Sequence, residues 1–390
     1  MKQLSIYLPP LAADYSGVCT ALFELNCLII IEDAACCTRN YVDYDEPRWS
    51  RTKRTTLCAQ LRTMDAILGN DEKLVELAAE GAAWIRPDFI ALVGSPVPAL
   101  IGTDFAGIAR EVEARTGLPA LGFGTSGFSN CHRGVDMALE ALCARFARPG
   151  VRPCPGQVNL LGLTPLDFGA GGNDAKLRDW LAEAGFGVNA SLAMGCTLDQ
   201  IARLGAAQVN LVVSRGGLGA ARWLERTFGT PWVAGVPVGT AEGERLAGLM
   251  RASAADGLSR VCPPPIPARG ERPVLVVGEQ IWANSLRSAL ALAGHPGPVT
   301  VASLFGLDRA LALPGDLALE GEDALLALLR EGSFRGLIAD PLITGLPGAQ
   351  GLWTGEWVHP AVSSNLYWDR VPSLLGAETD ALLGTWMEKD

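Results

Sequence analysis

Cysteines gather near the N-terminus of this chain. The segment 29–49, IIIEDAACCTRNYVDYDEPRW, runs from aliphatic residues into a polar, aromatic loop that carries the adjacent Cys36 and Cys37. Cys19 and Cys27 lie just upstream, so that four of the 10 cysteines are close together in sequence. Buried cysteine often acts only as a small hydrophobe, which is what we expect of Cys27 between Leu and Ile. Several thiols on a loop at a strand end instead favour ligation of a soft metal.

Histidine is scarce, and its positions leave alternatives open. The chain has only His132, His295 and His359, with no H-E-x-x-H zinc pattern and no C-x-x-C pair. His132 follows Cys131, which points either to a site near a domain cleft or to an exposed loop. His359, in WVHPAV, is either a residue of an interdomain cavity or a hydrogen-bonded histidine in a turn before proline.

Two glycine-rich segments resemble ligand-binding loops. Residues 122–127, GFGTSG, match G-x-G-x-x-G after a strand, but the next helix starts late and no acidic residue ends a following strand. We therefore expect no NAD or FAD site. Residues 214–223, SRGGLGAARW, could hold an anion with help from Arg215, although an ordinary tight turn is favoured. The chain lacks G-x-x-x-x-G-K-[ST], so no P-loop ATP site is expected.

Composition narrows the class of protein. The net charge is −10 and 49% of the residues are hydrophobic, which predicts a large core and argues against nucleic-acid or anionic-membrane partners. No basic-then-apolar leader opens the sequence, and no apolar run approaches the roughly 20 residues that span a bilayer. We expect a cytoplasmic protein, in which the cysteines do not form a disulfide framework.

Strand, turn and helix patterns alternate along the chain, which is typical of parallel α/β layers. Apolar runs predict strands near residues 27–33, 89–94, 118–123, 157–164, 186–192, 207–214, 231–238, 273–280, 299–305 and 336–340.

Apolar residues at helical spacing predict the helices between these strands. In the segment 57–68, LCAQLRTMDAIL, one helical face collects Leu57, Leu61, Met64 and Leu68. Further helices are expected from Asp71 to about Trp84 and from about 103 to 116.

Two proline-rich breaks, at 147–156 and 262–273, divide this pattern. They predict three Rossmann-like domains with parallel sheets: an N-terminal α/β domain with the cysteine cluster at 1–150, a second domain at 151–265, and a third at 266–390.

Several segments, taken in order, carry a resemblance to a known family. GVCTALFEL, IIIEDAACCTRNYVDYDEPRW, SPVPALIGTDF and LPALGFGTSGF resemble the N-terminal domain of nitrogenase component 1 proteins. The stretch from GCTLDQIARLGAAQVNLVVS to FGTPWV resembles their second domain. This superfamily includes nitrogenase molybdenum-iron protein subunits, cofactor-assembly scaffolds and dark-operative protochlorophyllide reductase. The chain most resembles its short nitrogenase-like group.

The resemblance implies an iron-sulfur cluster, of 4Fe-4S type, at the interface of two related subunits. Cys37 falls on the family's glycine-cysteine motif, and Cys36 replaces the glycine. Ser95, in GSPVPALIG, stands where the family has a cysteine, and serine oxygen is a poorer iron ligand than thiolate. A further family cysteine, expected near position 10, is missing; Cys19 is the nearest substitute and Cys58 another. The implied ligands are Cys37, with Cys19 or Cys36 second.

The resemblance also limits the chemistry. The cysteine that holds the large nitrogenase cofactor aligns near Ser214, so dinitrogen reduction is not expected, and His359 is a remnant of that pocket. Two functions stay open. One is a reductase subunit that pairs with a paralogous subunit or itself, receives electrons from an ATP-hydrolysing iron protein, and reduces a small molecule between its domains. The other is a non-catalytic scaffold or structural subunit for metal-cofactor assembly.

Overall fold

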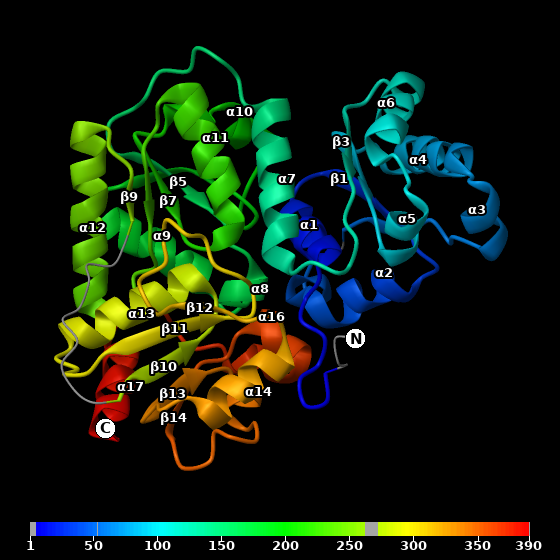
Figure 1. Cartoon of the computed structure of the whole chain (residues 1–390). Coiled ribbons are helices and arrows are strands. Elements are labelled where there is room, and N and C mark those ends of the chain that lie inside the picture. Colours follow the sequence, from blue (N-terminus) through cyan, green and yellow to red (C-terminus); the bar gives the residue numbers. More distant parts are fainter. Residues whose placement is uncertain (1–4, 53, 262–271, 390) are drawn as a thin grey trace.

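Three parallel β-sheets with helices packed around them form the protein (Figure 1). The computed structural model describes residues 5–52, 54–261 and 272–389. Every strand pair in these sheets is parallel, which confirms the predicted α/β fold class. The sheets use residues 27–123, 157–261 and 274–356. The predicted boundary at 265/266 lies outside the described residues.

The first sheet has the order β2-β1-β3-β4. Its central strands, CLIII and FIALV, are buried throughout, as expected of parallel strands covered on both faces. The strands of this sheet are β1 (Cys27–Ile31), β2 (Thr56–Cys58), β3 (Phe89–Val93) and β4 (Ala120–Phe123).

The other two sheets repeat this arrangement with five strands each, in the orders β6-β5-β7-β8-β9 and β12-β11-β10-β13-β14. The second sheet comprises β5 (Gln157–Leu161), β6 (Gly187–Ser191), β7 (Val209–Val212), β8 (Trp232–Ala234) and β9 (Arg260–Val261). The third comprises β10 (Val274–Val277), β11 (Val299–Ser303), β12 (Leu317–Ala318), β13 (Gly336–Ala339) and β14 (Trp353–Glu356).

Helices connect the strands and cover the sheets. The α-helices are α1 (Asp14–Leu22), α2 (Cys36–Asn40), α3 (Thr63–Leu68), α4 (Asp71–Ile85), α5 (Pro96–Ile101), α6 (Phe105–Thr116), α7 (Cys131–Phe146), α8 (Pro165–Phe168), α9 (Asn173–Glu183), α10 (Leu198–Ala202), α11 (Leu218–Phe228), α12 (Gly239–Asp256), α13 (Gln280–Leu292), α14 (Glu322–Glu331), α15 (Pro341–Thr344), α16 (Pro360–Ser363) and α17 (Ala377–Glu388). Short helices of other types are η1 (Tyr41–Asp45), η2 (Pro47–Ser50), η3 (Leu204–Ala206), η4 (Arg215–Gly217) and η5 (Ser364–Arg370). No helix among the described residues has both the length and the apolar character needed to cross a bilayer.

The helix predicted over 57–68 is wrong. Leu57 lies in β2, paired with Ile30 of β1, and the helix begins only at Thr63. Strand pairing beside the buried β1 overrides the 3.6-residue periodicity of the segment. As a result Leu68 is 74% exposed instead of lying in a core. By contrast, the helices predicted from Asp71 and over 103–116 are confirmed as α4 and α6.

Helices α1 and α7 lie side by side and join the first sheet to the rest of the molecule (Figure 1). Their backbones touch at two glycines. A Cβ atom on Gly17 would lie 1.9 Å from the carbonyl oxygen of Cys131, and one on Gly134 would lie 1.8 Å from that of Asp14. Only glycine permits this approach, which fixes where α7 begins.

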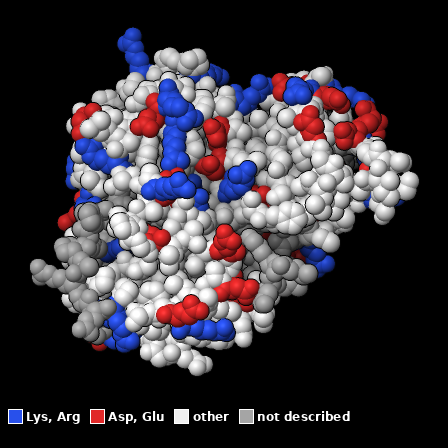
Figure 2. All heavy atoms as spheres, viewed as in Figure 1, with Lys and Arg blue, Asp and Glu red and all other residues white. Residues whose placement is uncertain are grey.

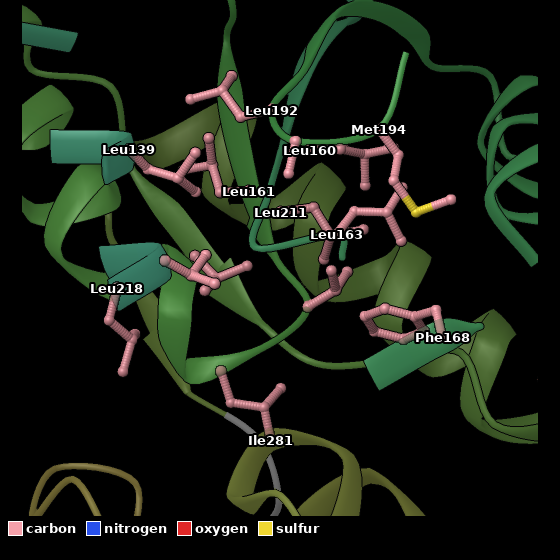
Figure 3. Packing of buried hydrophobic residues seen from close by; sticks show 14 of the residues in the cluster. Leu139, Leu160, Leu161, Leu163, Phe168, Leu192, Met194, Leu211, Leu218 and Ile281 are labelled. Atoms are coloured by element: carbon pink, nitrogen blue, oxygen red, sulfur yellow. The ribbon is translucent and has the colours of Figure 1, made fainter. Parts of the chain in front are cut away.

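A continuous core holds the second and third sheets together. Figure 3 shows Leu139 from α7, Leu160 from β5 and Phe168 from α8 in one apolar cluster, with Ile281 from α13 at its edge. The segment that leads into α8 is thereby anchored between two sheets.

Candidate functional site

In each sheet the first strand in sequence lies inside the sheet, between two later strands. The strand connections therefore diverge at β1/β3, β5/β7 and β10/β13, where doubly wound sheets leave a crevice at the carboxyl ends of the strands. The candidate residues lie at or after the carboxyl ends of strands in the three sheets. They form two separate groups.

The first group comprises Cys36, Cys37 and Cys58, here called the thiol edge. Cys36 and Cys37 open α2 just after β1, and Cys58 ends β2 opposite Ile31. Cys36 is exposed, and Cys37 and Cys58 are partly buried. An open hollow of about 450 Å³ lies beside Cys58 and α2. Cys36 is therefore open to solvent, and Cys58 lines a hollow that a second molecule can reach.

Asp33 fixes the geometry of the thiol edge. One oxygen of its carboxylate accepts a hydrogen bond from the backbone N–H of Ala35, and the other accepts from the Thr38 N–H at 2.6 Å. Cys58 Sγ lies 3.2 Å from Asp33 Oδ1. One carboxylate thus holds the start of α2 against the end of β2.

The thiol edge is electrostatically unfavourable for free thiolates. Burial and the Asp33 carboxylate raise the pKa of Cys37 to about 11, a hydrogen bond from Tyr15 opposes the rise, and Cys36 and Cys58 add to it. Burial likewise raises the pKa of Cys58. These thiols are protonated at neutral pH unless a cation compensates their charge, which is what metal ligation does.

The structure does not group Cys19 with the thiol edge. Cys19 is fully buried on α1, and the neighbours that act on its pKa after burial are Glu46 and Asp45. Cys27 is buried in the core, as predicted. Cys58, the other substitute considered from the sequence, ends β2 and lies beside Asp33.

Ser95 lies at the carboxyl end of β3, close to the thiol edge, but its hydroxyl is already used. Its Oγ donates to the carbonyl oxygen of Glu32 at 2.7 Å, and the side chain is buried. Beside it, burial and then Asp71 and Asp65 raise the pKa of Glu32 to about 7, against the lowering by Lys73. Ligation by Ser95 would require this hydrogen bond to break.

The second group, here called the histidine triad, comprises His132, Asp167 and His359. These residues come from the first turn of α7, from α8 and from the residue before α16. Asp167 Oδ1 lies 2.7 Å from His132 Nε2 and 2.9 Å from His359 Nε2. Both histidines are buried. Three segments far apart in sequence therefore meet on a single carboxylate oxygen.

The charges of the triad stabilise one another. Burial alone would raise the pKa of Asp167, but His132 and then His359 outweigh it and lower that pKa. Burial would lower the pKa of His132, but the Asp167 carboxylate, with Cys131, raises it well above its ordinary value. Burial raises the pKa of the adjacent Glu279, against the effect of His132. The triad is a buried polar centre with a carboxylate at its middle.

The predicted interdomain position of His359 corresponds to a very small space. His359 lines an enclosed cavity with Asp167, Glu279, Trp282 and Trp357, with room for about one water molecule. Two tryptophans and Phe168 line this cavity and leave no room there for a small-molecule substrate; a substrate elsewhere between the domains stays a prediction. Asp167 was not predicted from the sequence, although its place two residues after the Thr-Pro that ends the β5 run was a usable signal.

Backbone N–H groups of both glycine-rich loops donate hydrogen bonds to carboxylates of the protein itself. Asp14 accepts from the backbone N–H groups of Ser126 at 3.0 Å and Gly127 at 2.7 Å, within the GFGTSG loop. In SRGGLG, the N–H of Gly219 donates to Asp136 at 2.6 Å. Both loops thus serve internal packing.

Ser214 and Arg215 likewise have structural partners. Ser214 is fully buried and its Oγ donates to the carbonyl oxygen of Gly162 at 2.7 Å. The backbone N–H of Arg215 donates to Glu279 at 3.0 Å, and its guanidinium donates to the carbonyl of Phe305. This turn joins the second sheet to the third.

Comparison with known proteins agrees with this architecture. A solved structure of nitrogenase Cp1 at pH 6.5 covers 100% of this chain and 90% of its own, with a TM-score of 0.66 at 14% identity, a likeness in fold. A light-independent protochlorophyllide reductase subunit from Roseiflexus sp. is 30% identical over 204 residues, which are 50% of this chain and 35% of that protein. The corresponding reductase subunit from a Nostoc species is 27% identical over 187 residues, 45% of this chain and 37% of its own.

The chain thus spans about a third of the length of these curated relatives. The family of nitrogenase component 1 type oxidoreductases matches residues 15–264, which cover both the thiol edge and the second sheet. That match is well over half of the chain, and it coincides with the segments on which the resemblance was based. The protein belongs to the nitrogenase component 1 type oxidoreductase family.

Proposed function

We propose that this protein is a subunit of a nitrogenase-like, iron-sulfur-dependent reductase that receives low-potential electrons from an ATP-dependent iron protein. The observation that carries the proposal is the thiol edge: Cys36 and Cys37 follow β1, where the first sheet diverges, and Cys58 ends the neighbouring β2; Cys36 is exposed and the other two are partly buried. A cluster ligated there, when bound, accepts and passes single electrons.

The thiols suit an iron-sulfur cluster shared with another chain. Cys37 is the first proposed ligand, Cys36 the second and Cys58 the third. Cys19 would have to leave the core to take part, and Ser95 would have to exchange the Glu32 carbonyl for iron. A site with thiols on one side and open space on the other is incomplete in one chain, which supports completion by a paralogous subunit or a second copy.

The chain's own residues would position such a cluster. Asp33 holds α2 and β2 together, and the Tyr15 hydroxyl hydrogen-bonds Cys37. Glu32, with a pKa of about 7, can hold a proton next to this edge near neutral pH.

An apolar surface next to the thiols supports a protein partner. Met64, Ile67 and Leu68 of α3 are 60%, 68% and 74% exposed, and Leu100 of the neighbouring α5 is 76% exposed. Figure 2 shows this part of the first domain as a largely uncharged surface. Grouped exposed apolar side chains mark interaction sites far more often than single ones do.

The alternative function, a non-catalytic scaffold or structural subunit, is favoured by one observation. The cavity beside His359 accommodates about one water molecule, so a small-molecule substrate has no room at this position. In that case a cluster at the thiol edge would not pass electrons to a substrate between the domains.

Anaerobic purification with a co-expressed paralogous subunit tests the proposal. We expect stoichiometric iron and acid-labile sulfide, with an EPR signal in the reduced sample that Cys37→Ala removes or alters. Cys154→Ala, at an exposed thiol outside the first sheet, is the matched control and should leave iron unchanged. A folded, partnered complex without iron, or with equal iron in both variants, would contradict cluster ligation at the thiol edge.

A further inference from the structure

We propose that His132, Asp167 and His359 bind one divalent transition-metal ion, at a site distinct from the thiol edge and independent of whether a cluster is bound there. The three ligand atoms lie within 4.8 Å of one another, and they form the only such group of at least three His, Cys, Asp or Glu side chains that meets this distance among the described residues. Two imidazole nitrogens and one carboxylate oxygen are a donor set that suits iron, zinc, cobalt or manganese.

The observed distances fit a metal ion with little movement. Metal bonds of about 2.1 Å place neighbouring ligand atoms about 3.0 to 3.4 Å apart. Asp167 Oδ1 already lies 2.7 Å from His132 Nε2 and 2.9 Å from His359 Nε2. The two Asp167–histidine pairs need to spread by only a few tenths of an ångström. The two histidine nitrogens lie within 4.8 Å of each other and would close to the same spacing around the ion, which would replace the protons now shared with Asp167.

Surrounding residues contact all three ligands. Thr164 donates from Oγ1 to the other oxygen of Asp167 at 3.2 Å, which leaves Oδ1 for the ion. The Phe305 ring packs edge-on against both imidazoles, with centroids 4.8 Å from His132 and 5.0 Å from His359. Asp340 accepts from the backbone N–H of His359 at 2.8 Å. The hydrogen bond from Thr164 to Asp167 is of the kind that orients carboxylate ligands in known metal sites. The buried Nδ1 of His359 has no hydrogen-bond partner among the described residues.

A free coordination position would face the small cavity beside His359. Three protein ligands and a water are the pattern of catalytic rather than structural metal sites. The cavity has room for about one water. Its lining includes the indole of Trp282, whose Nε1–H is buried and has no hydrogen-bond partner in the described part of the chain. A water bound to the metal would accept a hydrogen bond from this indole N–H.

Cobalt(II) titration of the full chain tests the site. The experiment uses a Cys36→Ser, Cys37→Ser, Cys58→Ser background, so that the thiol edge cannot contribute. Sulfur-to-cobalt charge transfer would reveal ligation by a remaining thiol such as the exposed Cys154. We expect one equivalent of cobalt with visible d–d absorption. Asp167→Asn, which keeps the side-chain shape, and His359→Gln should each weaken binding at least about 100-fold. His295→Gln removes the third buried histidine, away from the site, and should bind cobalt as the background does.

Thr164→Val gives a second readout that leaves all three ligands present. It should weaken cobalt binding by about 10- to 100-fold, because Asp167 loses the contact that orients it. Circular dichroism confirms that each variant is folded. If the background chain binds no cobalt, or binds it equally well after Asp167→Asn, the triad is a hydrogen-bonded group only and the proposal fails, whatever the iron content of the unmodified complex.

Discussion

The thiol edge and the histidine triad differ in how the fold brings their residues together and in how exposed those residues are. The thiol edge is built from residues 33–58 of a single sheet and is open to solvent. The histidine triad joins residues from 132 to 359 and is closed, with His132 only 2% exposed. One site is local and incomplete, and the other is long-range and complete within the chain.

This difference indicates what each site needs in addition to its own side chains. At the thiol edge, the raised pKa of Cys37 and the exposed apolar side chains nearby support our proposal that a metal and a second chain complete the site. At the triad, His132 and His359 lower the pKa of Asp167, and Thr164, Phe305 and Asp340 contact the three residues. Variants of this chain that weaken partner binding should therefore affect only the thiol edge. Variants that disrupt the internal packing should affect both sites.

The largest effect is expected for Gly134→Ala, which acts on the packing that both sites share. Tyr15 on α1 reaches the thiol edge, and His132 on α7 belongs to the triad. A Cβ 1.8 Å from the Asp14 carbonyl oxygen must force the helices apart. We expect a loss of about 3 kcal/mol or more and a Tm lower by roughly 5–10 °C.

Thermal unfolding followed by circular dichroism measures this loss, and iron and cobalt binding should fall together. Gly248→Ala, in an open position on α12, is the control and should keep or slightly raise Tm. A Gly134→Ala variant as stable as wild type would mean that the helix contact does not determine either site.

The strands inside the sheets could be predicted because burial on both faces leaves a continuous apolar run, as in β1 and β3. The strands that escaped prediction, β2, β9, β12 and β14, are all at sheet edges and have two to four residues. Their position depends on a neighbour far away in sequence. The 57–68 segment shows this, since the pairing of Leu57 with Ile30 decides its structure.

The two sites differ in the same way. Cys36 and Cys37 could be identified because the thiol edge is largely contiguous in sequence. Asp167 could not be linked to His132 and His359, because their meeting depends on how α7, α8 and α16 pack. Glycines 17 and 134 set part of that packing, and their role depends on a backbone contact that no local pattern reveals.

The next largest effect is expected for Leu100→Glu, which should separate the two sites. A charge on the exposed apolar surface of α5 should weaken partner binding by about 10- to 30-fold and leave Tm almost unchanged. Analytical ultracentrifugation of the co-expressed complex measures this. Leu258→Glu, at a leucine that is 62% exposed in the second sheet's region, is the control. Equal weakening by both variants would place the partner elsewhere.

A smaller, pH-dependent effect is expected for Glu32→Gln. The pKa of Glu32 is raised to about 7 in the fold, so the folded protein holds this proton more tightly than the unfolded chain. Wild-type stability should therefore fall as pH rises from about 4.5 to 7 and then level off. Glu32→Gln does not lose stability in this way as pH rises. Its Tm should be roughly 2–4 °C above that of wild type at pH 8 and equal to it near pH 4.5.

Thermal unfolding from pH 4.5 to 8 checks the Glu32 prediction. Glu76→Gln, at an exposed position on α4, should follow wild type across this range. A constant offset between Glu32→Gln and wild type at every pH would show that packing, and not ionisation of Glu32, causes the difference.

The smallest effect, and the sharpest test of the thiol edge, is expected for Ser95→Ala. The change removes the buried hydrogen bond from Oγ to the Glu32 carbonyl and should cost about 0.5–1.5 kcal/mol. Thr125→Val removes the same kind of bond, 2.7 Å long, to the adjacent Gly94 carbonyl, so its cost should be similar. Because the Ser95 hydroxyl is already bound to the backbone, we expect iron content in the partnered complex to be unchanged in both variants. Loss of iron in Ser95→Ala alone would instead identify Ser95 as the oxygen ligand that completes the three thiols.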